Sequence, residues 1–323
     1  MSRLRASLLL IPATALLLAG CSATADSTAD EPTGLRVVSS TNVYGDIASA
    51  IGGEHVDVTS IISSAAQDPH SYEASARDQL AISKADIVIE NGGGYDPFMD
   101  TLIEAGASED VELVNVLDLS GRAPADDHAA DDHAEDEHAA DEHDHEHIEG
   151  VNEHVWYDLA AADALASALA HTFSHLDEEN ASTYSENYTE FSEQIAALTE
   201  RTAQLKAQHD GTAVALTEPV PLYLLEASGL RNLTPAEFSE AIEEGTDVPP
   251  ASLRATLDLF GSGEVAMLAY NEQTSSPETE QVRAVAEKNS VPVVSFAETL
   301  PDGEDYVSWM TTNIDAISDV LSS

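Results

Sequence analysis

Residues 178–208 read EENASTYSENYTEFSEQIAALTERTAQLKAQ, a stretch with neither proline nor glycine. Phe191, Ile195, Leu198 and Leu205 recur at the three- and four-residue spacing of one helical face, which predicts a single amphipathic helix. At 1.5 Å per residue, a helix of about thirty residues is ~45 Å long. Such a connector is stiff, unlike a hinge of short strands. A coiled-coil segment is the alternative, which the lack of sustained heptads disfavours.

The sequence on both sides of this helix alternates short apolar strands with helices. Wholly apolar strands between helices are typical of parallel sheets that are covered on both faces. We therefore predict an α/β fold with two Rossmann-like lobes, each built on a parallel sheet, joined by the long rigid helix. The strands are expected at Leu35–Ser40, Val56–Ile62, Asp86–Glu90, Val111–Val116, Thr212–Thr217, Glu264–Tyr270 and Val291–Phe296. The helices between them are expected at Tyr44–Ile51, Ala74–Lys84, Pro97–Glu104, Val220–Ser228, Ala251–Phe260, Pro277–Lys288 and Asp305–Leu321.

Residues 1–21 have the three-part layout of a secretory signal. A basic start precedes the apolar run 8–18, which is too short for a membrane span of ~20 residues. The run ends in Leu-Ala-Gly-Cys, which resembles a bacterial lipobox and implies cleavage before Cys21 and lipidation of that residue. Because several acyl chains hold a protein stably on a membrane, we expect an extracytoplasmic lipoprotein on the bacterial cell membrane. A cleaved, soluble secreted form is the alternative.

The charge balance favours cationic ligands. The 323 residues include 60 acidic and 12 basic side chains, for a formal net charge of −48. Such a surface repels nucleic acid, so no nucleic-acid partner is expected, and it concentrates cations. An acidic surface kept for solubility or for a salty habitat explains the same numbers. Since Cys21 is the only cysteine, an intrachain disulfide and a cysteine metal cluster are both excluded.

One segment belongs to neither lobe. Residues 126–147 read DDHAADDHAEDEHAADEHDHEH, which offers no apolar face to bury and predicts a disordered loop. Imidazole is a common ligand for zinc, copper and nickel, so we interpret the loop as an auxiliary metal-gathering segment; an acidic or pH-responsive linker is the alternative. Its histidines, half of the 12 in the chain, are His128, His133, His138, His143, His145 and His147.

Two further histidines lie in turns near expected strand ends. His70 stands in Asp-Pro-His-Ser-Tyr-Glu after the second strand, and His154 stands in Asn-Glu-His-Val-Trp-Tyr just after the histidine-rich loop. Open α/β sheets place ligands at the carboxyl ends of their strands. Taken alone, each is equally well an ordinary polar loop histidine.

These turns are two of six segments through which the chain resembles a known family. Along essentially its whole mature length, it resembles the solute-binding lipoproteins of bacterial ABC transporters for zinc and manganese. The resemblance also rests on the lipobox and the histidine-rich loop. The six segments, in order, are 68–73 (DPHSYE), 91–94 (NGGG), 154–156 (HVW), 216–219 (LTEP) with Tyr223 beyond it, 271–274 (NEQT) and 298–301 (ETLP).

The resemblance implies a metal cleft between the lobes, with His70 and His154 from the first lobe and Glu218 and Glu298 from the second. Without it, Glu218 reads as a helix-start carboxylate before Pro219, and Glu298 as a surface residue. Two imidazoles suit tetrahedral Zn²⁺, whereas two bidentate carboxylates would suit Mn²⁺ or Fe²⁺. The histidine-rich loop favours zinc as the transported ion.

The resemblance further implies a membrane permease as partner and a monomeric chain that is not an enzyme. A membrane-anchored metallohydrolase is the rival from another class, but no His-Glu-x-x-His or Gly-x-Ser-x-Gly motif occurs. A metal buffer or adhesin without a transporter is a third reading. The expected division is a signal peptide at 1–20, a lipidated flexible tether at 21–34, a first lobe at 35–177, the linking helix at 178–208 and a second lobe at 211–323.

Overall fold

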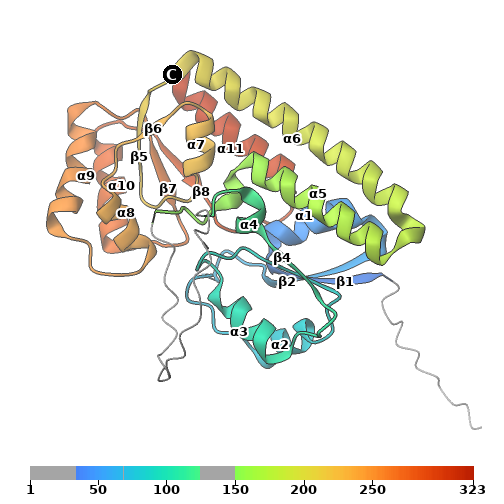
Figure 1. Cartoon of the computed structure of the whole chain (residues 1–323). Helices are drawn as coiled ribbons and strands as arrows, with labels where there is room; N and C mark the ends of the chain where they lie inside the picture. Colours follow the sequence, from blue (N-terminus) through green and yellow to red (C-terminus); the bar gives the residue numbers. More distant parts are fainter. Residues whose placement is uncertain (1–33, 68, 124–149) are drawn as a thin grey trace, which may run out of the picture. The chain divides into compact units, whose positions relative to one another are not determined.

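The computed structural model describes residues 34–67, 69–123 and 150–323. It contains two four-stranded parallel sheets, which confirms the predicted α/β class (Figure 1). The strand order is β2-β1-β3-β4 in the first sheet and β6-β5-β7-β8 in the second. The strands are β1 Leu35–Thr41, β2 Val56–Ile62, β3 Ile87–Glu90, β4 Glu112–Asn115, β5 Ala213–Leu216, β6 Arg231–Asn232, β7 Leu268–Asn271 and β8 Val293–Phe296.

Helices separate the parallel strands, as crossover connections require. Before the long helix lie α1 Asn42–Gly52, α2 Ala76–Ile82, α3 Pro97–Gly106, α4 Val116–Ser120 and α5 Leu159–Leu176. The long helix is α6 Ala181–His209, and after it come α7 Leu222–Ala227, α8 Ala236–Glu243, α9 Pro250–Ser262, α10 Pro277–Lys288 and α11 Tyr306–Leu321. Single 3₁₀ turns occur at η1 Gly53–His55, η2 Val155–Tyr157 and η3 Glu178–Asn180.

The long helix forms where the sequence predicts it. Its first residues, 178–180, make the 3₁₀ turn η3, and the 29-residue helix α6 follows. Phe191, Ile195, Leu198 and Leu205 are all buried, as the spacing predicts for one face. Helix α6 packs against α1, α5 and α11 (Figure 1). It therefore contacts helices that follow strands of both sheets.

Alternate strand residues divide between two kinds of core, because successive side chains point to opposite faces of a sheet. In β1, Val37 belongs to a core that includes residues of both sheets and of α6, whereas Val38 belongs to a separate core under α2 and α3. In β5, Leu216 joins the first of these cores and Ala215 joins a third, under α8, α9 and α10. A continuous apolar core thus connects the inner faces of the two sheets.

The sequence missed four strands and α-helices: β6, α4, α5 and α8. The two-residue strand β6, Arg231–Asn232, pairs with β5 but is too short to show any alternation. Helices α5 and α8 were not assigned, although both bury an apolar face. The strand expected at Val111–Val116 is shorter, because Asn115 caps a helix by accepting a hydrogen bond from the Asp118 amide.

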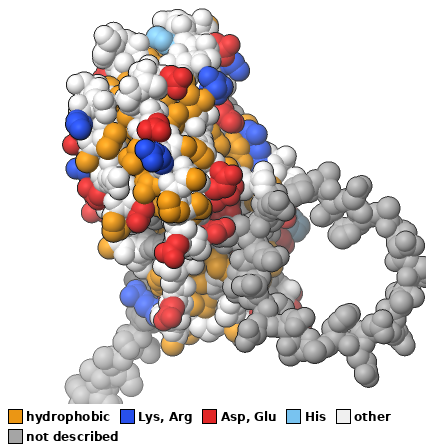
Figure 2. Space-filling model, turned by 90° about the vertical axis from the view of Figure 1, so that its left-hand side faces the viewer, with side chains coloured by type: hydrophobic (Ala, Val, Ile, Leu, Met, Phe, Trp, Pro, Cys, Tyr) orange, Lys and Arg blue, Asp and Glu red, His pale blue; other side chains and the backbone are white. Residues whose placement is uncertain are grey.

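The surface shows the acidic bias of the sequence. Figure 2 shows acidic side chains spread over one face, between apolar and a few basic ones, rather than gathered in a single cluster. None of the helices in the described ranges has the length and apolarity needed to cross a bilayer.

Glu90, at the carboxyl end of β3, gives the fold a pH-dependent stability. Burial and the nearby Asp96 carboxylate raise its pKa to about 7. The Asn115 amide donates a hydrogen bond of 2.9 Å to the Glu90 carboxylate, which partly opposes this rise. The folded state therefore holds this proton more tightly than the unfolded state, so stability falls as pH rises from about 4.5 to about 7.

We expect the parent protein to lose on the order of 1 kcal/mol of unfolding free energy through Glu90 between pH 5 and pH 7.5. The Glu90→Gln variant, which cannot titrate at this position, should not show that loss. Urea unfolding at the two pH values measures this difference in unfolding free energy. The control is Glu104→Gln, which replaces an exposed glutamate on α3. Equal pH slopes for the Glu90→Gln variant and the parent would contradict the assignment.

Candidate metal centre

His70 lies in the loop between β2 and α2, on the carboxyl side of the first sheet. The loop is fixed at its far end by a capping box, in which Ser75 and Asp78 satisfy each other's backbone amides. Tyr72 also donates a hydrogen bond of 2.9 Å to the Asp78 carboxylate. These contacts fix the backbone that follows His70; Asp68, the first residue of the motif, lies outside the described residues.

His154 immediately precedes the turn η2 and is 1% exposed. Its Nδ1 lies 2.7 Å from Oδ1 of Asn152, which also accepts the backbone amide of His154. Because that oxygen only accepts, Nδ1 carries the proton and Nε2 keeps its lone pair. Asn152 is held in turn from the second half of the chain, since Tyr223 donates to its carbonyl at 2.6 Å and its amide donates to the Pro219 carbonyl at 3.0 Å.

Glu218 and Glu298 follow two strands of the second sheet, β5 and β8. Asn271, at the end of β7 between those strands, donates from its amide nitrogen to both carboxylates, at 2.6 Å for Glu298. Gln273 accepts the backbone amide of Glu298 at 2.6 Å. One neutral amide therefore holds two buried carboxylates next to each other, where they would otherwise only repel.

The structure brings three of the four expected residues together. Ligand atoms of His70, His154 and Glu298 all lie within 4.8 Å of one another. Within the described part of the chain, Glu218 belongs to no such group, but Asn271 connects it with Glu298. Loops from both halves of the chain thus meet here. Nearby in sequence to Glu298, Leu300 also exchanges two backbone–side-chain hydrogen bonds with Asn42 of the first half.

A second group overlaps the first. Ligand atoms of His70, Glu153 and Glu243 also lie within 4.8 Å of one another. His70 Nδ1 is 3.6 Å from a Glu153 oxygen, and His154 Nδ1 is 3.5 Å from a Glu243 oxygen. Burial, followed by the charges of Glu153, Glu218 and Glu298, raises the pKa of Glu243 to about 9. Four carboxyl groups and two imidazoles therefore share one small, largely dry volume.

Aromatic rings form the wall behind the histidines. Tyr95 lies edge-on to His70 at 4.9 Å and to His154 at 5.7 Å, between ring centroids. Its hydroxyl lies 3.4 Å from the Glu298 carboxylate, to which it donates. Trp156 packs on both Tyr95, at 4.7 Å, and His154, at 5.1 Å. These rings restrict the imidazoles to few orientations, which suits them to bind a small ion.

Sequence reasoning named neither Glu243 nor Tyr95 as part of the site, and it gave Asn271 no role of its own. Asn271 ends an apolar strand, so the strand-end rule that was applied to His70 and His154 would have indicated it as well. Glu243 carried no such signal, because it lies in the acidic run Glu-Ala-Ile-Glu-Glu at the end of a helix that the sequence did not reveal.

The other histidines outside the loop lie away from this cluster. His55 packs edge-on against Tyr184, while His171 and His175 are exposed on α5. His209 is the last residue of α6. Several expected features lie outside the described residues: the signal peptide and tether, Cys21 with its lipid, and the auxiliary loop with His128, His133, His138, His143, His145 and His147.

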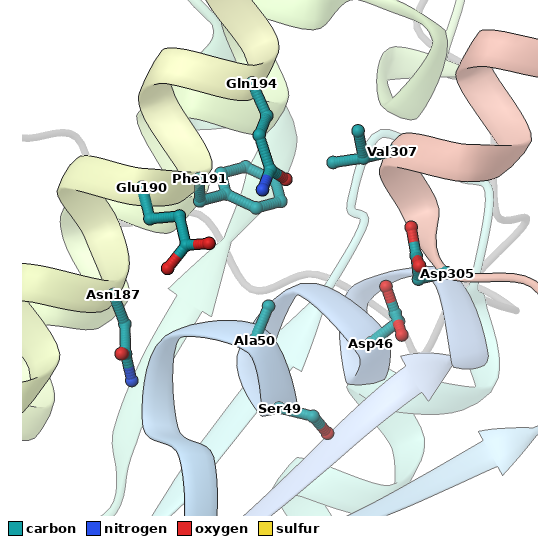
Figure 3. A pocket seen from close by; sticks show the side chains of 9 residues that line it. All are labelled: Asp46, Ser49, Ala50, Asn187, Glu190, Phe191, Gln194, Asp305 and Val307. Carbon is teal, nitrogen blue, oxygen red and sulfur yellow. The ribbon is translucent and has the colours of Figure 1, made fainter.

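A separate hollow lies between α1, α6 and the start of α11, with a volume of about 450 Å³ (Figure 3). Asp46, Glu190 and Asp305 contribute carboxylates to its lining, and Phe191 closes one side. It contains none of the clustered histidines. A metal ion needs donor atoms at bonding distance rather than volume, so the histidine–carboxylate cluster is the candidate site.

Comparison with known proteins identifies the family of the chain. The chain matches the family described as zinc-uptake complex component A, periplasmic, over residues 37–320. The manganese ABC transporter substrate-binding lipoprotein scaA of Streptococcus gordonii is 26% identical over 325 residues, covering 94% of each chain.

Solved structures share the fold. The crystal structure of ZnuA superposes with a TM-score of 0.68 at 18% identity, covering 88% of this chain and 98% of that chain. The structure of the protein FpvC from Pseudomonas aeruginosa in complex with Mn²⁺ superposes with a TM-score of 0.68 at 21% identity, covering 90% and 98%. The family match extends over most of the chain, which confirms the resemblance inferred from the sequence. The proteins of this family bind solutes for transport and are not enzymes. The protein thus belongs to the substrate-binding proteins of metal ABC transporters, the family of the periplasmic zinc-uptake component A.

Proposed function

We propose that this protein captures Zn²⁺ outside the cytoplasm with His70, His154, Glu218 and Glu298, and delivers it to the permease of an ABC transporter for import. The observation that carries the proposal is the convergence of His70, His154 and Glu298 within 4.8 Å. Two imidazoles and carboxylates in a largely buried volume are a common donor set for zinc. Glu218 completes the set through the amide of Asn271, which holds it beside Glu298.

The surrounding residues support this role by preparing the donors before the ion arrives. Asn152 Oδ1 accepts a hydrogen bond from Nδ1 of His154, which keeps the proton on Nδ1 and leaves Nε2 available for the ion. Asn271 donates one amide nitrogen to two carboxylates and holds them without adding charge. A divalent cation would then neutralise repulsion among Glu153, Glu218 and Glu298, which supplies part of the binding free energy.

The choice of zinc over manganese rests on two arguments. Intrinsic affinity at nitrogen and oxygen sites favours zinc over manganese, and six histidines in residues 126–147 add donors that suit zinc better than manganese. Against it, scaA of Streptococcus gordonii and PsaA of Streptococcus pneumoniae are described as manganese proteins. Two carboxylates that both bind through two oxygens would favour Mn²⁺ or Fe²⁺, and this is the second candidate cargo.

We also propose that Cys21 carries the lipid that anchors the mature, monomeric chain to the outer side of the cell membrane, after removal of residues 1–20. Residues 21–34 would act as a flexible tether. The lobes would extend over 35–177 and 211–323, joined by the helix at 178–208. Because one apolar core includes residues of both sheets and of α6, wide opening would expose that core. Small shifts and contact with the permease are therefore the expected route to metal release.

Calorimetric titration tests the cargo and the site together. A soluble form, residues 22–323, is stripped with a chelator and titrated separately with Zn²⁺ and Mn²⁺, and a variant lacking residues 126–147 is treated in parallel. We expect one tight zinc site that survives deletion of the loop and binds manganese more weakly. Tight binding that disappears with the loop would leave a metal buffer, and tight binding of manganese alone would make manganese the cargo.

A further inference from the structure

Two groups of donor atoms share His70. In the first group, His70 lies with His154 and Glu298. In the second group, it lies with Glu153 and Glu243. Each group is compact, with all ligand atoms within 4.8 Å of one another. One imidazole and two carboxylates are oxygen and nitrogen donors of the kind that bind divalent transition metals. The centre therefore offers two overlapping positions for an ion rather than one.

The two positions differ in their access to solvent. The side chains of His70 and Glu243 are each 13% exposed, whereas His154 is 1% and Glu298 is 2% exposed. An ion arriving from solvent therefore encounters His70 and Glu243 before it reaches the buried pair. Glu153, at 2% exposed, lies on the inner side of the second group.

Glu243 lies beside both groups of donor atoms. It is the last residue of α8, and one of its carboxylate oxygens lies 3.5 Å from Nδ1 of His154. Two carboxylates and the shared His70 could hold an ion that has shed only part of its water. Rotation of the His70 ring or a short displacement of the ion then suffices to exchange Glu243 and Glu153 for His154 and Glu298.

We propose that His70, Glu153 and Glu243 form an outer metal position through which the ion passes to and from the inner position. The inference rests on the proposed function, because it takes His154 and Glu298 as the site of final capture. Glu243 is the residue that makes the outer position, since the structure groups it with His70 and Glu153 and not with His154 and Glu298. Its role is kinetic: a transit position lowers the barrier in both directions and leaves the final affinity to the inner residues.

Stopped-flow kinetics test this role in the soluble form, residues 22–323, with Zn²⁺ as the probe. Tryptophan fluorescence reports the inner position, because the Trp156 ring lies 5.1 Å from the His154 ring. We expect Glu243→Gln, which keeps the shape of the side chain, to slow association and dissociation on the order of tenfold each, with little change in Kd. The matched control is Glu244→Gln, which makes the same substitution at the adjacent, exposed residue and is expected to change neither rate appreciably.

The outcomes separate this inference from the proposed function. Rates for Glu243→Gln equal to those for Glu244→Gln would overturn the outer position, and tight zinc binding in both variants would leave the proposed function standing. Faster dissociation without slower association would also overturn it, by making Glu243 a ligand in the final complex. If His154→Ala bound zinc as tightly as the parent, the proposed capture site would itself be wrong, whatever the result at Glu243.

Discussion

Replacing His154 by alanine is expected to weaken zinc binding by about a hundredfold to a thousandfold. Apparent binding free energies of four-ligand zinc sites are ~10–16 kcal/mol, or roughly 3 kcal/mol for each ligand, and every 1.4 kcal/mol corresponds to a factor of ten. His154 is 1% exposed, and Asn152 fixes its tautomer. Alanine therefore supplies no donor atom where the structure orients one.

Competition titration against a chelator of known zinc affinity measures this loss in the variant that lacks residues 126–147, so that binding by the loop does not obscure it. His171→Ala is the control, because it removes an exposed histidine from the adjacent helix α5. The control should bind as the parent does. A loss of less than about tenfold in the His154 variant would place the tight site elsewhere in the chain.

Replacing Trp156 by alanine is expected to lower the free energy of unfolding of the metal-free protein by about 3–5 kcal/mol, as for other buried tryptophans. The Trp156 ring is 1% exposed and packs against Tyr44, Tyr95, His154 and Tyr157. The cavity left by the ring would also free the His154 imidazole, so zinc affinity should fall as well.

Urea unfolding followed by circular dichroism, with a chelator present, measures the stability change. Leu176→Ala, at the exposed end of α5, is the control and should alter stability by no more than about 0.5 kcal/mol. Trp156→Phe should recover part of the loss, because a phenyl ring fills part of the cavity. Equal unfolding midpoints for Trp156→Ala and the parent would show that this ring does not support the site.

Several features of this protein could be predicted from local patterns. Uninterrupted helical spacing predicted the helix that became α6, and apolar runs between helices predicted parallel sheets, because both follow from the periodicity of side chains along one segment. His154 and Glu298 were indicated by resemblance to a family, and the structure brings both of them together with His70. Short elements such as β6 gave no signal, because two residues cannot display a period.

Only the tertiary structure decided which charged residues share the centre. Glu243 lies in an acidic run in which its neighbour Glu244 is exposed, and nothing in that run distinguishes the two. The packing of α8 turns one of them toward His154 and leaves the other in solvent. Likewise, Asn271 can hold two carboxylates only because β7 lies between β5 and β8 in the sheet. Sequence patterns record which side chains a single element buries, whereas contacts between elements depend on how separate elements pack, and no local period encodes that.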